Sequence, residues 1–468
     1  MRRGVCSRML LGGTLACLAA SAAGAEPFRL ITLDPGHFHA ALIQKEMYPE
    51  LSRRVAVYAP LGPDLAEHLK RIAQFNQRGE NPTSWELEVH CSPDYLERML
   101  QEPPGAVVML SGRNSAKMDR IVASIEAGMH VLADKPWTLC SRDVPRLAAA
   151  LDTAGRKGLV AYDIMTERYE ITSIVARAMA ADRSIFGHPV NGAPREPGAC
   201  LRSVHHIMKS VAGVPNLRPA SFFNILEQGE ALSDVGTHLA DLAQWTLFPG
   251  QAIDYRTGIR MLSASRRPSA LSRSQFQRVT GLDSFPVPLA PWVKGDTLAY
   301  MCNNSVAYLL RGVHVQLDVL WEYEAPPGVG DLYEAVFRGS RAKLEIRQGQ
   351  KENYRPELYL IPGAEHRREV LAAARALLAR RFPGYLLEDM GTAWRVVIPD
   401  GHRTTHETHF AQVARQFFEY LKSPGKMPSW EKPNMAAKYW VTTRGVEMAA
   451  EPAGVRAVSR EAAPTTAP

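Results

Sequence analysis

The chain has 468 residues, more than the roughly 250 to 300 at which a single core stops growing, so two domains are expected. Its 46% hydrophobic and 22% charged content is near the globular average, which excludes a fibrous, disordered or membrane-spanning protein. The formal charge of +7 falls to +4 without the three arginines of the first 25 residues. The remaining basic residues are scattered, which excludes a nucleic-acid partner.

The first 25 residues have the three parts of a signal peptide. Three arginines accompany the apolar run Met9–Ala20, and Ala-Gly-Ala at 23–25 provides a cleavage site, so residues 1–25 are expected to be removed from an exported, periplasmic protein. The run has 12 residues, whereas a membrane span needs about 20, so no stable span is expected. Arg2-Arg3 leaves twin-arginine export open beside the Sec route, and Cys17 leaves lipidation as a less favoured alternative.

Four cysteines remain after the expected cleavage, at positions 91, 140, 200 and 302. Their spacings match no zinc-binding or redox motif. Although an oxidising compartment would allow them to pair, we expect free, buried thiols in a chain of this length.

From Phe28 to about Val160, short strand-like runs alternate with helical patterns. This alternation predicts a Rossmann-type, doubly wound parallel sheet over residues 26–160. Apolar residues from Met118 to Ile125 recur at helical spacing before Gly128, which predicts a helix. The expected strands are Phe28–Leu33, Val55–Tyr58, Leu87–His90, Ala106–Leu110 and His130–Ala133.

From about Ser203, strands accumulate with few helices between them, which predicts an α+β domain over residues 161–450 with a large, mostly antiparallel sheet. Apolar and polar residues alternate over Val313–Trp321, as in a strand with one buried face. Neighbouring strands are expected at Ser305–Leu310, Tyr333–Phe337 and Ala342–Ile346. The other expected segments are a helix at Asp234–Trp245, a loop at 262–297, an exposed basic helix at Arg367–Arg381 and a disordered tail at 451–468.

Dinucleotide-binding folds place a glycine-rich turn between the first strand and the following helix. The turn here reads Asp34-Pro35-Gly36-His37-Phe38-His39, so only the middle glycine of the fingerprint is present. Gly36 still allows the backbone to approach a pyrophosphate, and the helix that follows offers its free N–H groups. The cofactor contacts expected in this turn are Gly36, His37, Phe38 and His39.

The same turn permits a different class of site. Histidines two apart, as in Asp34-x-x-His37-x-His39, can ligate a metal in hydrolases, and His205-His206 could complete such a set. We favour a lining or structural role for His37 and expect no metal. The second strand ends in Tyr58-Ala59-Pro60, where an acid would normally bind the adenosine ribose, so NAD and NADP are not distinguished.

A more specific pattern follows the fourth and fifth strands. Asn114 begins a helix that ends in Ala-Gly, and the next strand leads into Asp134-Lys135-Pro136. This pattern resembles the glucose-fructose oxidoreductase, inositol dehydrogenase and rhizopine-catabolism (Gfo/Idh/MocA) family, in which the triplet is usually Glu-Lys-Pro. A residue before proline is extended, and ligands bind at the carboxyl ends of parallel strands, so Lys135 is expected in the cleft rather than in solvent. The resemblance implies that Asn114, Asp134, Lys135 and Pro136 bind NAD or NADP.

The segment Asp234-Val-Gly-Thr-His238-Leu-Ala-Asp241 is similar to the Asp-x-Gly-x-His-x-x-Asp motif of the same family. On a helix, Asp234, His238 and Asp241 share one face. A carboxylate one turn from an imidazole can orient the ring and raise its basicity, which suits a general base acting on a carbinol proton. Such pairs are commonly structural, and the specificity comes from the combination with Asp134-Lys135-Pro136.

Three further segments resemble a narrower branch of this family that has its own C-terminal domain. They are Asp163–Tyr169, Ser203–Lys209 and Trp430–Met435 with Lys438–Trp440, and the resemblance covers about residues 28–451. It implies substrate contacts at Arg168, His205, His206, Lys209 and Asp241. For His205, His206 and Lys209 the alternative is packing within a loop.

The resemblance implies an enzyme that oxidises a CH–OH group of a sugar, cyclitol or glycoside with NAD or NADP. In it, His238 takes the carbinol proton, Asp234 orients His238 or binds a neighbouring hydroxyl, and Lys135 stabilises charge on the reacting oxygen. Outside the cytoplasm such a cofactor would be held tightly. The expected partner is a small carbohydrate or polyol, and family analogy suggests a homo-oligomer.

Three other functions remain open at this point. The same fold supports NAD-dependent glycoside cleavage or elimination without net redox change. A metal-dependent hydrolase would use His37, His39 and His205. A non-catalytic sugar-binding protein would use the cleft without turnover.

Overall fold

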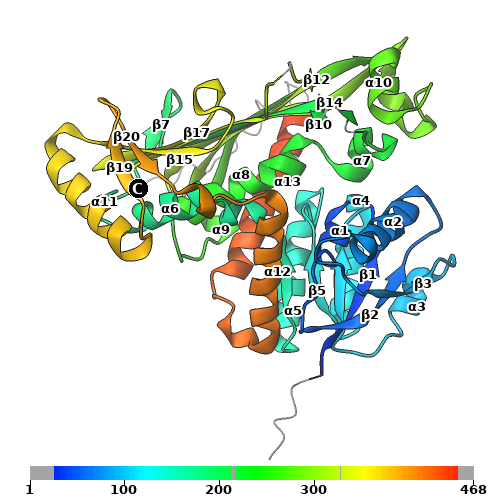
Figure 1. Ribbon diagram of the computed structural model, residues 1–468. Coiled ribbons are helices and arrows are strands. Elements are labelled where there is room, and N and C mark those ends of the chain that lie inside the picture. The colour runs from blue at the N-terminus through cyan, green and yellow to red at the C-terminus, as the bar shows by residue number, and fades with distance from the viewer. Residues whose placement is uncertain (1–25, 212–213, 216, 327, 452–468) are drawn as a thin grey trace, which may run out of the picture.

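The computed structural model describes residues 26–211, 214–215, 217–326 and 328–451. The expected signal peptide, and all but the first residue of the expected tail, lie outside the described residues. Two sheets form the framework, and helices lie between and around them (Figure 1). Within the described ranges, no helix combines the length and the hydropathy needed to cross a bilayer.

The first sheet has six parallel strands in the order β3-β2-β1-β4-β5-β6. Its strands are β1 (Phe28–Leu33), β2 (Leu51–Tyr58), β3 (Glu86–His90), β4 (Val107–Leu110), β5 (His130–Ala133) and β6 (Ala161–Asp163). The chain changes direction between β1 and β4, which creates the crevice where doubly wound sheets bind ligands. The predicted Rossmann-type sheet is therefore confirmed.

Helices cover both faces of this sheet. Those near it in sequence are α1 (His39–Leu42), α2 (Pro63–Gln77), α3 (Tyr95–Met99), α4 (Asn114–Glu126) and α5 (Val144–Arg156). Alternate residues of β1 face opposite ways, so Ile31 packs in the cluster of α4 and α5, while Leu30 packs in another cluster. That second cluster includes Phe410 and Phe417 of α12 (His406–Lys422), so a helix from the far end of the chain covers one face of the first sheet.

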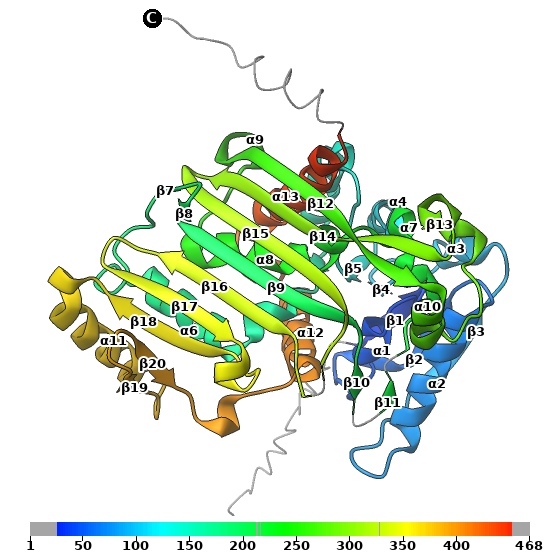
Figure 2. The ribbon, with the colours of Figure 1, turned by 90° about the horizontal axis from the view of Figure 1, so that it is seen from above.

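The second sheet has ten strands, and its main path runs β12-β14-β15-β9-β16-β17-β18-β20-β19. These are β9 (Ala199–Met208), β12 (Ile259–Ser272), β13 (Val293–Lys294), β14 (Thr297–Leu310), β15 (Val313–Glu324), β16 (Leu332–Arg338), β17 (Ala342–Gln348), β18 (Glu357–Pro362), β19 (Leu386–Asp389) and β20 (Trp394–Val397). Within this second sheet, β9 and β15 are the only described strands that pair in parallel, which confirms a large, mostly antiparallel sheet. Figure 2 looks onto this sheet, with α8 (Ala231–Leu247) and α13 (Glu431–Ala450) behind it.

The remaining elements are short or peripheral. They are α6 (Ile171–Ala181), β7 (Gly192–Ala193), β8 (Glu196–Pro197), β10 (Ser210–Val211), β11 (Val214–Pro215), α7 (Ile225–Gln228), α9 (Tyr255–Gly258), α10 (Arg273–Thr280) and α11 (Arg367–Arg381). The cysteines at 91, 140, 200 and 302 are free, as expected, but only Cys302 is buried, while Cys140 and Cys200 are half-buried and Cys91 is exposed.

One prediction and one alternative from the sequence were wrong in the second half. The expected loop at 262–297 contains most of the 14-residue strand β12 and all of the helix α10. β12 was missed because it is the edge strand of the sheet, where polar residues and a proline are tolerated, and its register shifts at Pro268. The segment Ser203–Lys209 is not a loop either, because most of it belongs to the central strand β9.

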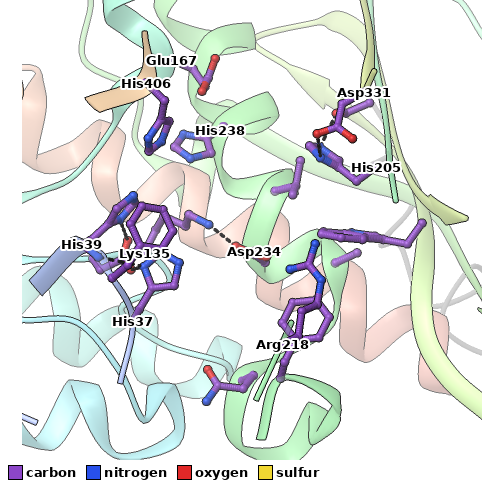
Figure 3. Close-up of a pocket in the computed structure, with 18 of the residues that line it drawn as sticks. His37, His39, Lys135, Glu167, His205, Arg218, Asp234, His238, Asp331 and His406 are labelled. Atoms are coloured by element: carbon purple, nitrogen blue, oxygen red, sulfur yellow. Dashed lines mark hydrogen bonds and ion pairs between the residues drawn. The ribbon is translucent and has the colours of Figure 1, made fainter. Parts of the chain in front are cut away.

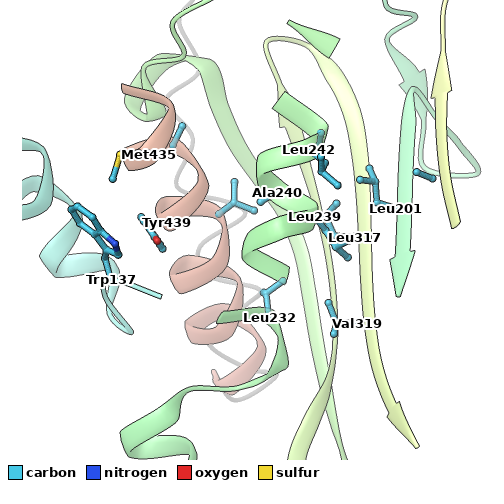
Figure 4. Packing of buried hydrophobic residues seen from close by; sticks show 14 of the residues in the cluster. Trp137, Leu201, Leu232, Leu239, Ala240, Leu242, Leu317, Val319, Met435 and Tyr439 are labelled. Carbon is cyan, nitrogen blue, oxygen red and sulfur yellow. The ribbon is translucent and has the colours of Figure 1, made fainter. Parts of the chain in front are cut away.

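A continuous apolar core joins the two sheets through α8 and α13. Leu239 of α8 packs in the same cluster as Leu201 and Leu317 of the second sheet, as Figure 4 shows. On the other side, the ring of Tyr439 on α13 stacks near Trp137, with 6.5 Å between centroids. Trp137 directly follows the Asp134-Lys135-Pro136 triplet, so the position of the triplet depends on this packing.

A buried network of charges lies within this junction. Arg168 binds Asp241 in a bidentate pair, with Nε–Oδ2 at 2.6 Å and Nη2–Oδ1 at 2.7 Å, and also binds Glu431. Lys438 lies 2.8 Å from Asp163 and 2.9 Å from Asp241. β6, α8 and α13 are therefore tied together by ion pairs that exclude water.

Lys438→Met is expected to lower the free energy of unfolding by about 3 to 5 kcal/mol, because it leaves buried Asp163 without a cation among the described residues and leaves Arg168 to neutralise both Asp241 and Glu431. Urea denaturation measures the loss. Arg53→Met is the control, since it breaks the exposed pair Arg53–Glu86 and should cost about 1 kcal/mol or less. Equal losses in the two variants would contradict a special role for the buried network.

Candidate active site

A cleft of about 1660 Å³ opens between the two sheets, at the carboxyl ends of β1, β4 and β5. One wall comes from the loops after these strands, and the other from α8 and the second sheet. Figure 3 shows ten labelled residues of this cleft. Lys135, Asp234 and His238 all line it, so the structure brings the three predicted catalytic residues together.

The turn after β1 departs from the glycine fingerprint for a physical reason. Asp34 has φ +50°, so it adopts the left-handed conformation that glycine usually provides. Its buried carboxylate accepts hydrogen bonds from Arg120 and, at 3.1 Å, from Arg113. The two guanidinium groups neutralise the charge, which allows an aspartate to stand at the first glycine position.

Gly36 allows a close contact with the loop after β4, whereas the sequence predicted a close approach to a pyrophosphate. A Cβ on Gly112 would lie only 2.5 Å from the nitrogen of Gly36, so the two glycines allow the loops after β1 and β4 to touch. The amides of Gly36 and His37 already donate to the carbonyls of Asp34 and Ser111. These two amides are therefore not free for a pyrophosphate, and α1 has only four residues.

Asp134 is buried and binds two histidines. Its Oδ2 lies 2.9 Å from Nδ1 of His37, and its Oδ1 lies 3.0 Å from Nδ1 of His39. Burial lowers the pKa of His39 to about 3, so its ring is neutral and donates through Nδ1–H. Burial alone would raise the pKa of Asp134, but the adjacent histidines hold it well below its ordinary value.

The positions of His37, His39 and Asp134 also bear on the alternative of a metal-dependent hydrolase. Ligand atoms of His37, His39 and Asp134 lie within 4.8 Å of one another, a spacing that a metal could use. His205 does not join them, because it binds Asp331 on the opposite wall. Each oxygen of Asp134 already has one imidazole partner, so hydrogen bonding accounts for the cluster.

Lys135 and Asp234 form an ion pair across the cleft, from the end of β5 to the first turn of α8. Burial lowers the pKa of Lys135, but Asp234 and Asp134 outweigh it and raise the pKa above its ordinary value. The amine is therefore charged. Asp234 makes no hydrogen bond to His238 within the described chain, so its expected role in orienting His238 is corrected: it positions Lys135.

His238 lies one turn along α8 from Asp234, on the cleft side. Burial and the positive charge of Lys135 hold the pKa of His238 well below 6.5, so its ring is neutral near pH 7. Nδ1 is buried, and no described residue hydrogen-bonds to it. A neutral imidazole beside a charged amine can accept a proton from a hydroxyl that the amine contacts.

The opposite wall contains some of the predicted substrate contacts. His205 and Lys209 line the cleft and bind the carboxylate of Asp331, at 3.3 Å and 2.9 Å. His206, its neighbour on β9, is only 2% exposed and does not line the cleft. The predicted contact at His206 is therefore corrected to a buried, structural position.

Other predicted contacts are also placed away from the cleft. Arg168 and Asp241 belong to the buried charge network, so the prediction that they contact substrate is wrong. Pro136 is buried behind Lys135 rather than lining the cleft. Asn114 does line it, and its Nδ2 donates to the carbonyl of Gln228 at 2.9 Å.

Several cleft residues were missed from the sequence. His406, at the start of α12, stacks on His39 with 5.2 Å between ring centroids, although 367 residues separate them. Arg218 and Asp331 stand in segments without a motif. Glu167 could have been identified from the sequence, because it lies inside the segment Asp163–Tyr169 that carries the family resemblance. Half-buried Asp64, in the first turn of α2, also lines the cleft.

Comparisons with solved structures agree with this fold. GenD2 from gentamicin A biosynthesis, in complex with NAD, has a TM-score of 0.55 at 16% identity, covering 93% of this chain and 97% of its own. KijD10, a 3-ketoreductase from Actinomadura kijaniata in complex with NADP and TDP-benzene, has a TM-score of 0.52 at 15% identity, covering 89% and 96%. At these identities the likeness concerns the fold. No curated protein matches the chain.

Two findings identify the family. Residues 175–450, more than half of the chain, match the family described as "Putative oxidoreductase C terminal domain". The crystal structure of a "putative oxidoreductase" from Parabacteroides merdae is 44% identical, has a TM-score of 0.87, and covers 90% of this chain and 97% of its own. The chain therefore belongs to the Gfo/Idh/MocA oxidoreductases, in the branch that carries this C-terminal domain.

Proposed function

We propose that the protein is an exported NAD(P)-dependent dehydrogenase that oxidises a CH–OH group of a sugar, cyclitol or glycoside. The observation that supports this most is the placement of charged Lys135 and neutral His238 on facing sides of one cleft at the crevice of the first sheet. Two neighbours of the same fold support the proposal, since one was solved in complex with NAD and the other in complex with NADP.

The residues present fit a dinucleotide in position and size. The cleft lies at the β1–β4 crevice and extends along the start of α2. There the carboxylate of Asp64 approaches the turn at Gly36, and it can take the place of the ribose-binding acid absent from the end of β2. Asn114 and Lys135 would bind the nicotinamide half. The nicotinamide would supply the hydride acceptor.

The chain's own residues would act on the substrate hydroxyl. His238 accepts the carbinol proton, and the ammonium of Lys135 donates a hydrogen bond to the oxygen on which charge develops. Asp234 keeps Lys135 charged and fixes its direction. Because burial and, in addition, the charge of Lys135 lower the pKa of His238, the base stays unprotonated near neutral pH.

His238→Ala and Lys135→Met are expected to lower the turnover number by about 10²- to 10⁴-fold, the usual contribution of a positioned proton-transfer group. A polyol panel with mass-spectrometric readout of product and reduced cofactor measures this. His90→Ala is the control, because His90 is half-buried at the end of β3 and does not line the cleft. Unchanged turnover in His238→Ala would remove His238 from the mechanism.

A second candidate is redox-neutral cleavage, in which transient oxidation acidifies a neighbouring C–H. Glu167 favours it, because it lines the same cleft and could act as a second acid or base. Burial, with Glu170 adding to it, raises the pKa of Glu167 to about 7 against the opposing effect of Lys135. In the same mass-spectrometric assay, a released aglycone with unchanged cofactor identifies this reaction.

The raised pKa of Glu167 has a consequence for stability. Because the folded-state pKa lies above the ordinary 4.5, the stability contributed by the protonated form is full below about pH 4.5 and is lost as the pH rises through about 7. Glu167→Gln removes this loss, so its melting temperature should rise relative to wild type between about pH 5 and about pH 8. Glu126→Gln, at an exposed position, is the control. A difference that does not vary with pH would contradict the raised pKa.

We propose in addition that the protein is exported, because residues 1–25 have the three parts of a signal peptide. Free nicotinamide cofactor is scarce outside the cytoplasm, so we propose that the enzyme retains its cofactor. Mass spectrometry of protein purified from an exporting host should give a chain that begins at Glu26, and denaturation should release NAD or NADP. Purified protein without cofactor, and without a rise in melting temperature on adding either one, would contradict retention.

A further inference from the structure

Arg218 lines the cleft on the side of the second sheet, and its side chain is held in place from several directions. Its Nε donates to the carbonyl of Ile207 at 2.7 Å, and its Nη2 donates to the carbonyl of His206 at 3.1 Å. The guanidinium also lies over the rings of Phe222, at 4.5 Å, and Trp321, at 4.9 Å. Carbonyls and aromatic faces thus fix its direction before any ligand binds.

Two cations that line the cleft near Arg218, one on each wall, have carboxylate partners. Lys135 pairs with Asp234, and Lys209 pairs with Asp331 at 2.9 Å. Arg218 has no carboxylate within 4 Å among the described residues, although Asp234 and Asp331 are its nearest acidic neighbours electrostatically. Both of these carboxylates already pair with a lysine, so no carboxylate of the described residues forms an ion pair with Arg218.

Free donors of Arg218 face the cleft. A guanidinium has five N–H groups, and the two carbonyls occupy only two of them. Nη1 makes no hydrogen bond to a described residue, and Arg218 lines the cleft. In Figure 3 the guanidinium points toward Asp234, the partner of Lys135.

Stacking alone does not require a ligand, as a second arginine shows. Arg177 lies over the ring of Trp245 at 4.6 Å and donates to its carbonyl at 3.2 Å. It too has no carboxylate within 4 Å in the described chain, but it does not line the cleft. Arg218 differs from Arg177 in its position beside the reacting groups.

We propose that Arg218 binds an anionic group of the substrate, a carboxylate or a phosphate, so that the enzyme acts on an acidic sugar or a sugar phosphate. The inference rests on the proposed function for the identity of the reacting hydroxyl. Planar guanidinium groups suit both anions because they can donate two parallel hydrogen bonds. Since Arg218 points toward Asp234, the anion lies close to the carbon that is oxidised.

Binding of matched sugars to the full mature chain tests this proposal without requiring turnover. The probes are glucuronate and galacturonate for a carboxylate, glucose 6-phosphate for a phosphate, and glucose and galactose as neutral references, titrated by calorimetry. Wild type should bind at least one acidic probe about tenfold or more tightly than its neutral reference. Which acid binds distinguishes carboxylate from phosphate recognition.

Arg218→Gln should remove the preference for the acidic probe and leave the affinity for the neutral sugar unchanged. Arg218→Lys keeps the charge but loses the paired geometry, so it should retain part of the preference. Arg177→Gln is the matched control and should behave as wild type. Melting temperatures confirm that each variant is folded, and Arg218→Lys replaces Arg218→Gln if the latter fails to fold.

Two results would overturn the proposal: no preference for any acidic probe in wild type, or equal losses for acidic and neutral sugars in Arg218→Gln. Failure of the dehydrogenase function is separable. In that case no carbinol in the panel reduces the cofactor, while the acid preference and its dependence on Arg218 persist.

Discussion

The ion pair between Lys135 and Asp234 is the contact on which the site depends, because it connects the end of a strand in the first sheet to the first turn of the helix beneath the second. The pair holds the amine charged and directed, and burial together with that charge depresses the pKa of His238. The neutral base His238 and the charged hydrogen-bond donor Lys135, which need opposite protonation states, are thus maintained side by side. A change in the separation of the two sheets would alter both groups at once.

Helix α8 carries two aspartates seven residues apart on one face, and their surroundings give them different roles. Asp234 opens onto the cleft and has 35% of its side chain exposed, whereas Asp241 is 1% exposed and lies between Arg168 and Lys438. The deeper pair of cations anchors the helix against α13. The same motif therefore supplies one residue to the chemistry and one to the framework that supports it.

The sequence was sufficient for elements whose periodicity follows burial, such as the strand at Val313 and the helix that begins at Asn114. It failed for β12, because an edge strand with polar residues has no apolar alternation to detect. The motifs identified Lys135, Asp234 and His238, which all line the cleft. His406 could not be found in this way, because its relation to His39 exists only after α12 packs on the first sheet.

The pairing of charged side chains was the feature that the sequence predicted least well. Arg168 and Asp241 each stand in a family motif, which gave no indication that they bind each other, 73 residues apart, away from the cleft. The position of Asp34 at a glycine site looked like a weakness of the dinucleotide motif. It is a compensated substitution, since Arg120 and Arg113 neutralise it from the next loop and helix.

The packing of α12 on the first sheet also determines the order in which the chain can reach its final form. The ribosome delivers strands β1 to β6 more than 240 residues before α12, so the face of the sheet that carries Leu30 and Val107 emerges without its cover. A sheet with one uncovered apolar face has an incomplete core, and the exposed hydrophobic surface makes it prone to aggregation. Folding of the first sheet can therefore be completed only when synthesis is nearly finished and α12 becomes available.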